Sequence, residues 1–107
     1  MKTITLLFSL SLFAFSQLSF AVETNTGEKA FNSICVHCHA KGGNMLAPDK
    51  TLHKADLEKN GMNNSAAIVQ QITKGKNNMP AFASSFNAQE IEAIAAYVLK
   101  QAEADWK

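Results

Sequence analysis

The sequence contains no arginine, only two cysteines and two prolines, and a formal net charge of +1. A nucleic-acid-binding domain normally presents a basic face, often with arginines, so this composition excludes that class. Two cysteines cannot form the several disulfides that hold small secreted scaffolds together. A length of 107 residues leaves room for one domain and excludes a large multi-domain enzyme. A hydrophobic share of 47% is too high for a disordered chain.

Residues 1–21 have the pattern of a secretory signal peptide. Lys2 precedes a stretch without charge that runs to Val22, and Ser19-Phe20-Ala21 offers small residues at the positions expected before a cut after Ala21. The stretch is nearly long enough to span a bilayer, so a membrane anchor is the alternative. Its serines and glutamine dilute the apolar run, which favours a cleaved signal. We therefore expect an exported, soluble domain over residues 22–107, with no membrane insertion.

Loss of Lys2 with the signal leaves nine lysines against nine acidic residues, so the expected domain is formally neutral. A domain of this size buries only about 60% of the surface of its unfolded chain, or slightly more, and often needs a disulfide or a cofactor. Exported compartments usually permit disulfides. The chemistry of the two cysteines therefore indicates whether a disulfide or a cofactor stabilises the domain.

Apolar residues recur at helical spacing along the rest of the chain, and no stretch alternates convincingly as a strand does. Asn64 or Ser65 can cap the third of four expected helices, and Gly75 can end it. Asn87 and Glu90 have the spacing of a capping box for the last helix. The class is therefore all-α. The expected helices cover Gly27–Ile34, residues 52–59, residues 65–74 and residues 88–102.

The motif with clear chemistry is Cys35-Val36-His37-Cys38-His39, a C-x-x-C-H sequence of the kind that attaches c-type haem. Two thiols at this spacing can bond covalently to the vinyl-derived carbons of the porphyrin, and the next residue can offer an imidazole to the iron. A covalently attached cofactor stays with the protein after export, and its apolar surface enlarges a small core. We therefore predict one haem c, bound through Cys35 and Cys38, with His39 on the iron.

The same cysteines are compatible with two other chemistries. A thioredoxin-like redox pair normally stands in a βαβ context, and the helical pattern offers none. A zinc site needs further ligands, but there is no second cysteine pair, and His37 and His53 are the histidines that remain. Haem attachment explains the motif better than either.

Haem iron bound by His39 has a second axial position to fill. Met79 is the favoured candidate, because it lies before Pro80 in a polar loop between two expected helices and the proline biases it towards an extended conformation. A thioether ligand stabilises ferrous iron and raises the reduction potential. Two protein ligands leave no open position for substrates, so the expected role is electron transfer and not catalysis.

Other residues compete for the second axial position. His53 is the main rival, and bis-histidine ligation would lower the potential; its place between Leu52 and Lys54 is more typical of an exposed helix residue. Met45 follows a glycine-rich turn and is expected near the haem edge, whereas Met62 is expected to pack in the core.

Taken together, C-V-H-C-H and K-N-N-M-P-A-F resemble the motifs of class I cytochromes c and, more narrowly, those of the cytochrome c6 family. C-x-x-C-H alone indicates only a c-type haem, whereas the combination is far more specific. The resemblance covers nearly all of residues 24–106. It includes Gly27, Phe31, residues 40–44, residues 48–52, residues 61–63, residues 75–77, residues 95–99 and Trp106.

This resemblance implies a fold of about four helices around one covalently bound haem. Cys35 and Cys38 would be the attachment points, and His39 and Met79 the axial ligands. Gln71 matches a glutamine that the family places near the porphyrin, where its amide can tune the potential. The first and last helices are expected to cross closely at Gly27, Phe31 and Tyr97.

The resemblance also implies a task. A cytochrome c6 is a monomeric carrier that takes one electron from the cytochrome b6f complex, through cytochrome f, to photosystem I in the thylakoid lumen of a plastid or cyanobacterium. The alternative is a periplasmic respiratory cytochrome c that donates to a terminal oxidase, because it would use the same haem residues.

One segment departs from the family pattern. Ser84-Ser85 stand where many relatives have Gly-Arg, and that arginine helps docking on photosystem I. Lysines can replace it as point charges, without the fork of a guanidinium group. Haem propionates add roughly −2 to a neutral protein, so electrostatic steering should be weak and sensitive to salt.

Overall fold

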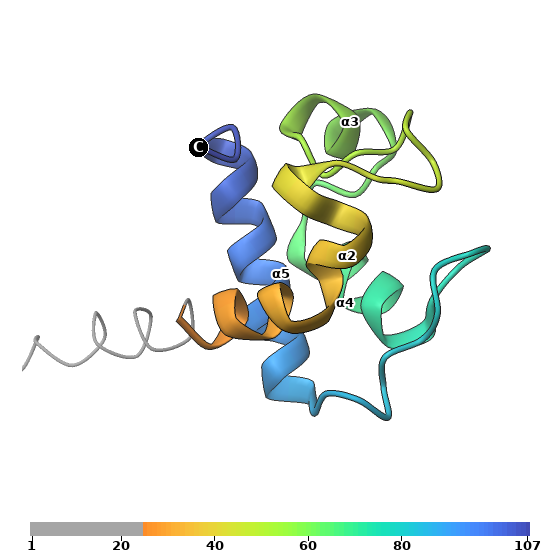
Figure 1. Ribbon diagram of the computed structural model, residues 1–107, viewed down its shortest axis with the longest axis vertical. Coiled ribbons are helices and arrows are strands. Elements are labelled where there is room, and N and C mark those ends of the chain that lie inside the picture. Colours follow the sequence, from red (N-terminus) through yellow and green to blue (C-terminus); the bar gives the residue numbers. More distant parts are fainter. Residues whose placement is uncertain (1–24) are drawn as a thin grey trace, which may run out of the picture.

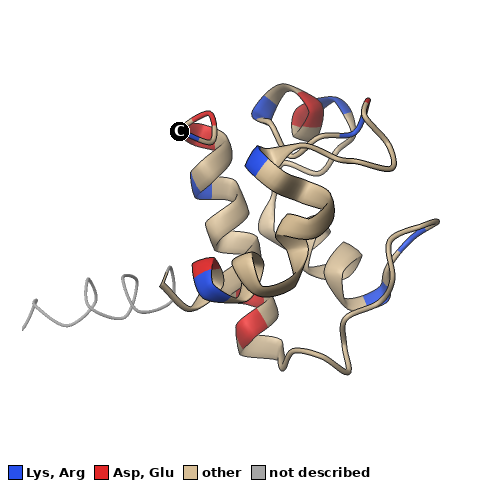
Figure 2. Cartoon of the chain, viewed as in Figure 1, with Lys and Arg blue, Asp and Glu red and all other residues tan. Residues whose placement is uncertain are grey.

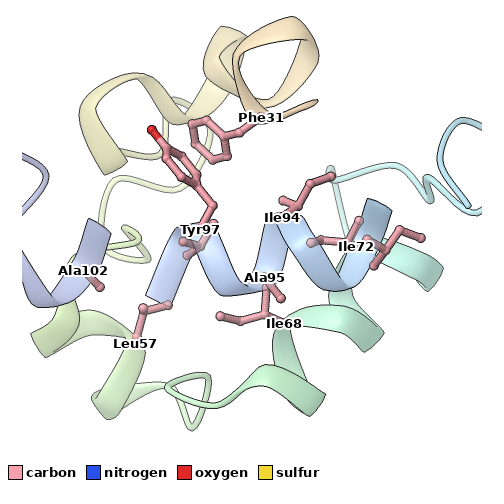
Figure 3. Close-up of a cluster of buried hydrophobic side chains, with 10 residues drawn as sticks. Phe31, Leu57, Ile68, Ile72, Ile94, Ala95, Tyr97 and Ala102 are labelled. Carbon is pink, nitrogen blue, oxygen red and sulfur yellow. The ribbon is translucent and has the colours of Figure 1, made fainter. Parts of the chain in front are cut away.

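The last helix provides the surface against which the other elements pack. The computed structural model describes residues 25–107, and within them α5 (Ala88–Glu103) contacts α3 (Lys54–Lys59), α4 (Ser65–Lys74) and the helical turn η2 (Ala40–Gly42) (Figure 1). Figure 3 shows Phe31 on one side of α5, with Ile68 and Leu57 on the other. The core therefore lies on both sides of α5, and its most buried side chains are Phe31, Leu57, Ile72, Ile91, Ala93, Ile94, Ala95, Val98 and Ala102.

Capping side chains set where α4 and α5 begin. The Asn64 side chain accepts a hydrogen bond from Ala67 N at 2.8 Å. At α5, Asn87 Oδ1 accepts from Glu90 N at 2.8 Å, while Glu90 Oε1 accepts from Asn87 N at 2.9 Å. These bonds satisfy backbone N–H groups that have no partner inside a helix. The capping box expected from the sequence is confirmed, and Asn64 rather than Ser65 caps α4.

The first helical segment is longer than the sequence predicted. Residues 25–30 are helical, and the chain continues through a π-helical turn, η1 (Phe31–Cys35), into α2 (Val36–His39) and η2. The N–H of Val36 bonds to the carbonyl of Phe31, five residues back, which makes the turn wider than an α-helical one. The segment ends where Lys41 and Gly42 both take positive φ angles of 55° and 78°. The helix therefore extends beyond the face Gly27–Ile34 that the sequence indicated, and it breaks at Lys41 and Gly42, close to the glycine-rich turn expected after it.

The first segment and α5 cross at contact distance. A side chain at Gly27 would overlap the carbonyl group of Ala93 and come within 3.0 Å of Tyr97 Cβ. The Phe31 and Tyr97 rings lie beside this crossing, with centroids 5.3 Å apart. The close approach expected at Gly27, Phe31 and Tyr97 is confirmed.

The short helix α3 begins two residues later than the sequence predicted. Leu52 lies in a bend before the helix instead, where its N–H donates to the carbonyl of Gly42 at 2.7 Å. Asp56, in the first turn of α3, accepts from both the hydroxyl and the N–H of Thr51, at 2.7 and 3.1 Å. These hydrogen bonds lower the pKa of the Asp56 carboxyl. The Thr51–Asp56 contact therefore fixes the entry to the helix.

The architecture is all-α, as predicted. Residues 25–107 contain helices and turns and no named strand; the backbones of Lys76 and Met79 form an isolated bridge in the loop after α4. No helix in this part of the chain is both long and apolar enough to cross a bilayer. The signal peptide expected over residues 1–21 lies outside the described residues.

We predict that Gly27→Ala destabilises the fold by about 1–3 kcal/mol, because the added methyl group must push the first segment away from the Ala93 carbonyl. Denaturant unfolding measures the change. Lys29→Ala, at an exposed position of the same helical segment, is the matched control and should cost little. Equal stabilities for Gly27→Ala and wild type would mean that the crossing is not tight.

Candidate haem site

The C-x-x-C-H motif spans the wide turn and the start of α2. Cys35 closes η1, Cys38 lies three residues further on, and His39 ends α2. Residues three apart on a helix are neighbours on its surface, so the two thiols occupy adjacent turns. Both are free; Cys35 is half-buried and Cys38 is exposed. The helix thus offers two thiols and an imidazole within one and a half turns.

The state of Cys35 distinguishes two functions of the pair. Burial raises the pKa of the Cys35 thiol, and hydrogen bonding to its own backbone offsets part of that rise. A raised pKa keeps the thiol protonated near neutral pH, whereas a thiol–disulfide enzyme needs a readily formed thiolate. Such an enzyme needs this of only one thiol, so the fold is the stronger argument: residues 25–107 form no βαβ unit, which argues against the thioredoxin-like alternative.

The imidazole of His39 is oriented by the loop that follows it. Its Nδ1 lies 2.8 Å from the carbonyl oxygen of Gly43. A carbonyl only accepts, so Nδ1 carries the proton and Nε2 carries the lone pair. The same loop is fastened by a hydrogen bond from Met45 N to the carbonyl of Cys38 at 2.9 Å. His39 therefore has the tautomer, and the hydrogen bond from its other ring nitrogen, that metal-bound histidines generally have.

Met79 lies in a tight turn between α4 and α5. Its N–H and carbonyl pair with the carbonyl and N–H of Lys76, both at 3.0 Å, and Asn77 takes a positive φ of 56° to close the turn. Gly75 is needed beside it, because a Cβ there would come within 2.6 Å of the Met79 carbonyl. The Met79 side chain is half-buried and packs against the core. Gln71 Nε2 lies 3.5 Å from its sulfur and donates to it.

The competing candidates for the second axial position occupy other environments. His53 directly precedes α3, and its Nδ1 lies 3.4 Å from a carboxylate oxygen of Asp105. Met62 packs against the core, as expected. Met45, expected near the haem edge, is 69% exposed, and Leu46 beside it is 58% exposed. Met79 is distinguished by its sulfur, which accepts a hydrogen bond from Gln71 Nε2.

The donor set fits a haem iron. Imidazole Nε2 and a thioether are ligands that c-type cytochromes use, and the described residues contain no group of three or more His, Cys, Asp or Glu side chains able to hold a metal ion. Exposed Met45 and Leu46 lie on the loop that bonds back to the Cys38 carbonyl, so this loop presents apolar side chains to its surroundings. The two candidate ligands come from separate segments: His39 ends α2, and Met79 lies in the turn after α4. The neighbouring elements η2 and α4 both contact α5.

Comparisons with known proteins agree with this chemistry. Residues 22–98 match a family described as cytochrome c oxidase, cbb3-type, subunit III. The chain is 50% identical over 99 residues to cytochrome c6 of a Nostoc species, covering 92% of this chain and 89% of that protein. It is 46% identical over 108 residues to cytochrome c6 of Porphyra purpurea, covering 98% of each. Cytochrome c6 of the diatom Phaeodactylum tricornutum has a similar structure, with a TM-score of 0.75 and 45% identity over 78% of this chain and 98% of that one.

The helical fold and the C-x-x-C-H motif define a class I c-type cytochrome. Such proteins contain haem and carry electrons. Within this class, the chain belongs to the cytochrome c6 family.

Sequence reasoning did not find every residue that shapes the site. Gly43 orients His39 through its backbone carbonyl, and the glycine pair signalled only a turn. Asn77 takes a left-handed conformation, a role that its type permits and does not reveal. Trp106 Nε1 donates to the carbonyl of Leu52 at 3.0 Å, a contact between residues far apart in sequence. A lone tryptophan gave no hint of that partner.

We predict that, in haem-free protein near neutral pH, Cys38 is alkylated by iodoacetamide faster than Cys35, because Cys35 is buried and its pKa is raised. As the pH rises towards the range where Cys35 ionises, its rate should increase and the difference should narrow. Peptide mapping by mass spectrometry gives both rates. Cys35→Ser and Cys38→Ser isolate each thiol, and a faster Cys35 at neutral pH would contradict the prediction.

Proposed function

We propose that one haem c is attached through thioether bonds to Cys35 and Cys38, with His39 and Met79 as its axial ligands. The observation that carries this proposal is that each ligand side chain is held by a hydrogen bond, His39 by Gly43 and Met79 by Gln71. Ligands held in place by their surroundings lose less entropy when they bind a metal. When bound, the haem supplies a one-electron ferric/ferrous couple.

His39, Met79 and Gln71 shift the balance between ferric and ferrous iron in different directions. Donation from His39 Nδ1–H to Gly43 makes the imidazole a stronger base, which favours ferric iron. The Met79 thioether favours ferrous iron. Gln71 donates to the same sulfur and draws electron density from it, which favours ferrous iron further. Two protein ligands leave no open iron position, so the protein transfers electrons and does not act as an enzyme.

The proposed task is transfer of electrons from the cytochrome b6f complex, through cytochrome f, to photosystem I. It is supported by the similarity to cytochromes c6 from Nostoc and Porphyra purpurea. We further propose that residues 1–21 are removed as a signal peptide and that the mature chain, residues 22–107, works as a soluble monomer in the thylakoid lumen.

Docking would rely on lysines. In Figure 2, lysines mark the end of α4 and the loop after it, whereas acidic residues mark the first turns of α5. Lys74 and Lys76 are exposed, and they flank the turn that contains Met79. Ser84 and Ser85 are exposed as well and contribute no charge. A partner would therefore meet point charges beside Met79 and no guanidinium group.

A second function has one observation in its favour. The family matched by residues 22–98 is described as a subunit of a cbb3-type cytochrome c oxidase. A periplasmic respiratory cytochrome that donates to a terminal oxidase would use the same haem residues. The first function is preferred, because the curated relatives of 46–50% identity over nearly the whole chain are cytochromes c6.

We predict that Met79→Ala leaves the haem covalently attached and lowers the reduction potential by a sizeable part of the roughly 0.8 V range that axial ligands set. Gln71→Val keeps the sulfur and should lower the potential less. Spectroelectrochemistry of the purified holoproteins measures both changes. Lys100→Ala, at an exposed position of α5 away from both candidate ligands in sequence, is the control and should leave the potential unchanged. An unchanged potential in Met79→Ala would assign the sixth ligand to another residue.

We predict that the mature holoprotein reduces flash-oxidised photosystem I rapidly, with a rate that saturates as its concentration rises. Steering by a few lysines should make the dependence on salt modest. Transient absorbance of the photosystem measures the rate. Slow reduction that stays linear in concentration, together with rapid turnover of a cbb3-type oxidase, would favour the respiratory function.

A further inference from the structure

We infer that Trp106 is a positioning residue for the axial histidine. It acts through the segment from Gly42 to Leu52, which contains the carbonyl group that orients His39. This inference rests on the proposed role of His39 as a ligand of haem iron. It adds a residue that is remote in sequence from the C-x-x-C-H motif.

A short chain of contacts joins the two residues. Trp106 Nε1–H donates to the carbonyl of Leu52 at 3.0 Å, and the N–H of Leu52 donates to the carbonyl of Gly42 at 2.7 Å. Gly42 is bonded to Gly43, whose carbonyl accepts from His39 Nδ1 at 2.8 Å. The indole therefore lies two hydrogen bonds and one peptide bond from the acceptor of the imidazole.

The indole also packs directly on the backbone of this segment. A Cβ at Gly42 would lie 2.5 Å from Trp106 Nε1 and 2.6 Å from two carbons of the ring. Gly42 is buried and has a φ of +78°, so both its conformation and its neighbour require glycine. The position of the peptide that joins Gly42 to Gly43 is thus limited from one side by the indole.

The tryptophan itself is held in a strained conformation. Trp106 has a φ of 57° and follows Asp105, at 59°. A bulky side chain in the left-handed region is unfavourable, and such strain persists only where the surroundings impose it. The imposing contacts are the Leu52 carbonyl and the rings of Phe31 and Tyr97, with centroids 5.4 and 6.0 Å from that of Trp106.

Two polar contacts, the first of them an ion pair, join the chain just after Leu52 to the C-terminal end of the molecule. Lys54 Nζ lies 3.0 Å from Glu103 Oε1, and His53 Nδ1 lies 3.4 Å from Asp105 Oδ1. Both pairs are largely exposed, so they add little to the stability of the contact between the two segments. The Trp106 indole is the half-buried part of the contact and packs against the core.

The test compares variants that separate the indole N–H from its packing. Trp106→3-benzothienylalanine keeps the bicyclic shape and removes only the N–H donor. Trp106→Phe removes the donor and also replaces the bicyclic ring by a single, smaller one. Ile68→Val removes one buried methylene at the interface of α4 and α5 and controls for simple loss of stability. The holoproteins are compared by the exchange rate of the His39 Nδ1 proton, followed by NMR in the ferrous state, and by the reduction potential.

We expect the benzothienyl variant to exchange the Nδ1 proton faster, by up to about tenfold, as for the loss of one hydrogen bond. Its potential should rise, because a weaker bond to Gly43 makes the imidazole a poorer base. Trp106→Phe should show both changes more strongly, and Ile68→Val neither. Unchanged exchange and potential in both Trp106 variants, with a normal low-spin haem spectrum, would overturn the inference and leave the proposed function intact. Absence of any haem-shifted His39 resonance in the wild-type holoprotein would instead overturn the ligand assignment, and the inference with it.

Discussion

The contact between the first helical segment and α5 is the constraint on which the rest of the molecule depends. It is possible because Gly27 has no side chain, so the two backbones meet at the Ala93 carbonyl. This close crossing brings the Phe31 and Tyr97 rings together, and the Trp106 ring completes an aromatic cluster with them. Offset and tilted ring pairs of this kind add to the stability gained by burial. The helix that continues into C-x-x-C-H is therefore anchored one turn before its first thiol.

The two side chains proposed as ligands depend on this frame in different ways. His39 ends a helix that is anchored at the crossing, and the glycine loop beyond it returns an acceptor to the imidazole. Met79 lies in a turn closed by its own backbone pairing with Lys76, and Gln71 on α4 reaches its sulfur. One ligand is thus positioned by a rigid helix and a loop, the other by a turn packed on the core. α5 contacts both η2 and α4, so it connects the two supports.

Local signals predicted the parts of the fold that depend on neighbouring residues. The capping box at Asn87 and the glycine stop at Gly75 were read from sequence, because each is a bond or a φ angle within a few residues. The motif likewise identified the thiols and the imidazole. The start of α3 was misplaced, because the Leu52 backbone is held by Gly42, outside any local window. The partners of His39 and Trp106 were missed for the same reason: backbone carbonyls accept hydrogen bonds and have no signature in the sequence.

The wide turn at Phe31–Cys35 divides the helix into two parts, whose side chains are rotated relative to one another about the helix axis. In a regular α-helix, Phe31, Cys35 and Cys38 would follow the spacing i, i+4 and i+7 and share one stripe. The bond from Val36 N to the Phe31 carbonyl adds a residue to that turn, so the side chains after it are rotated relative to those before it. Residues up to Phe31 can then face α5 while the motif follows a different direction. A helical wheel drawn across this turn would assign the thiols to the wrong face, and the number of residues between Phe31 and Cys35 is as much a part of the motif as the letters C-x-x-C-H.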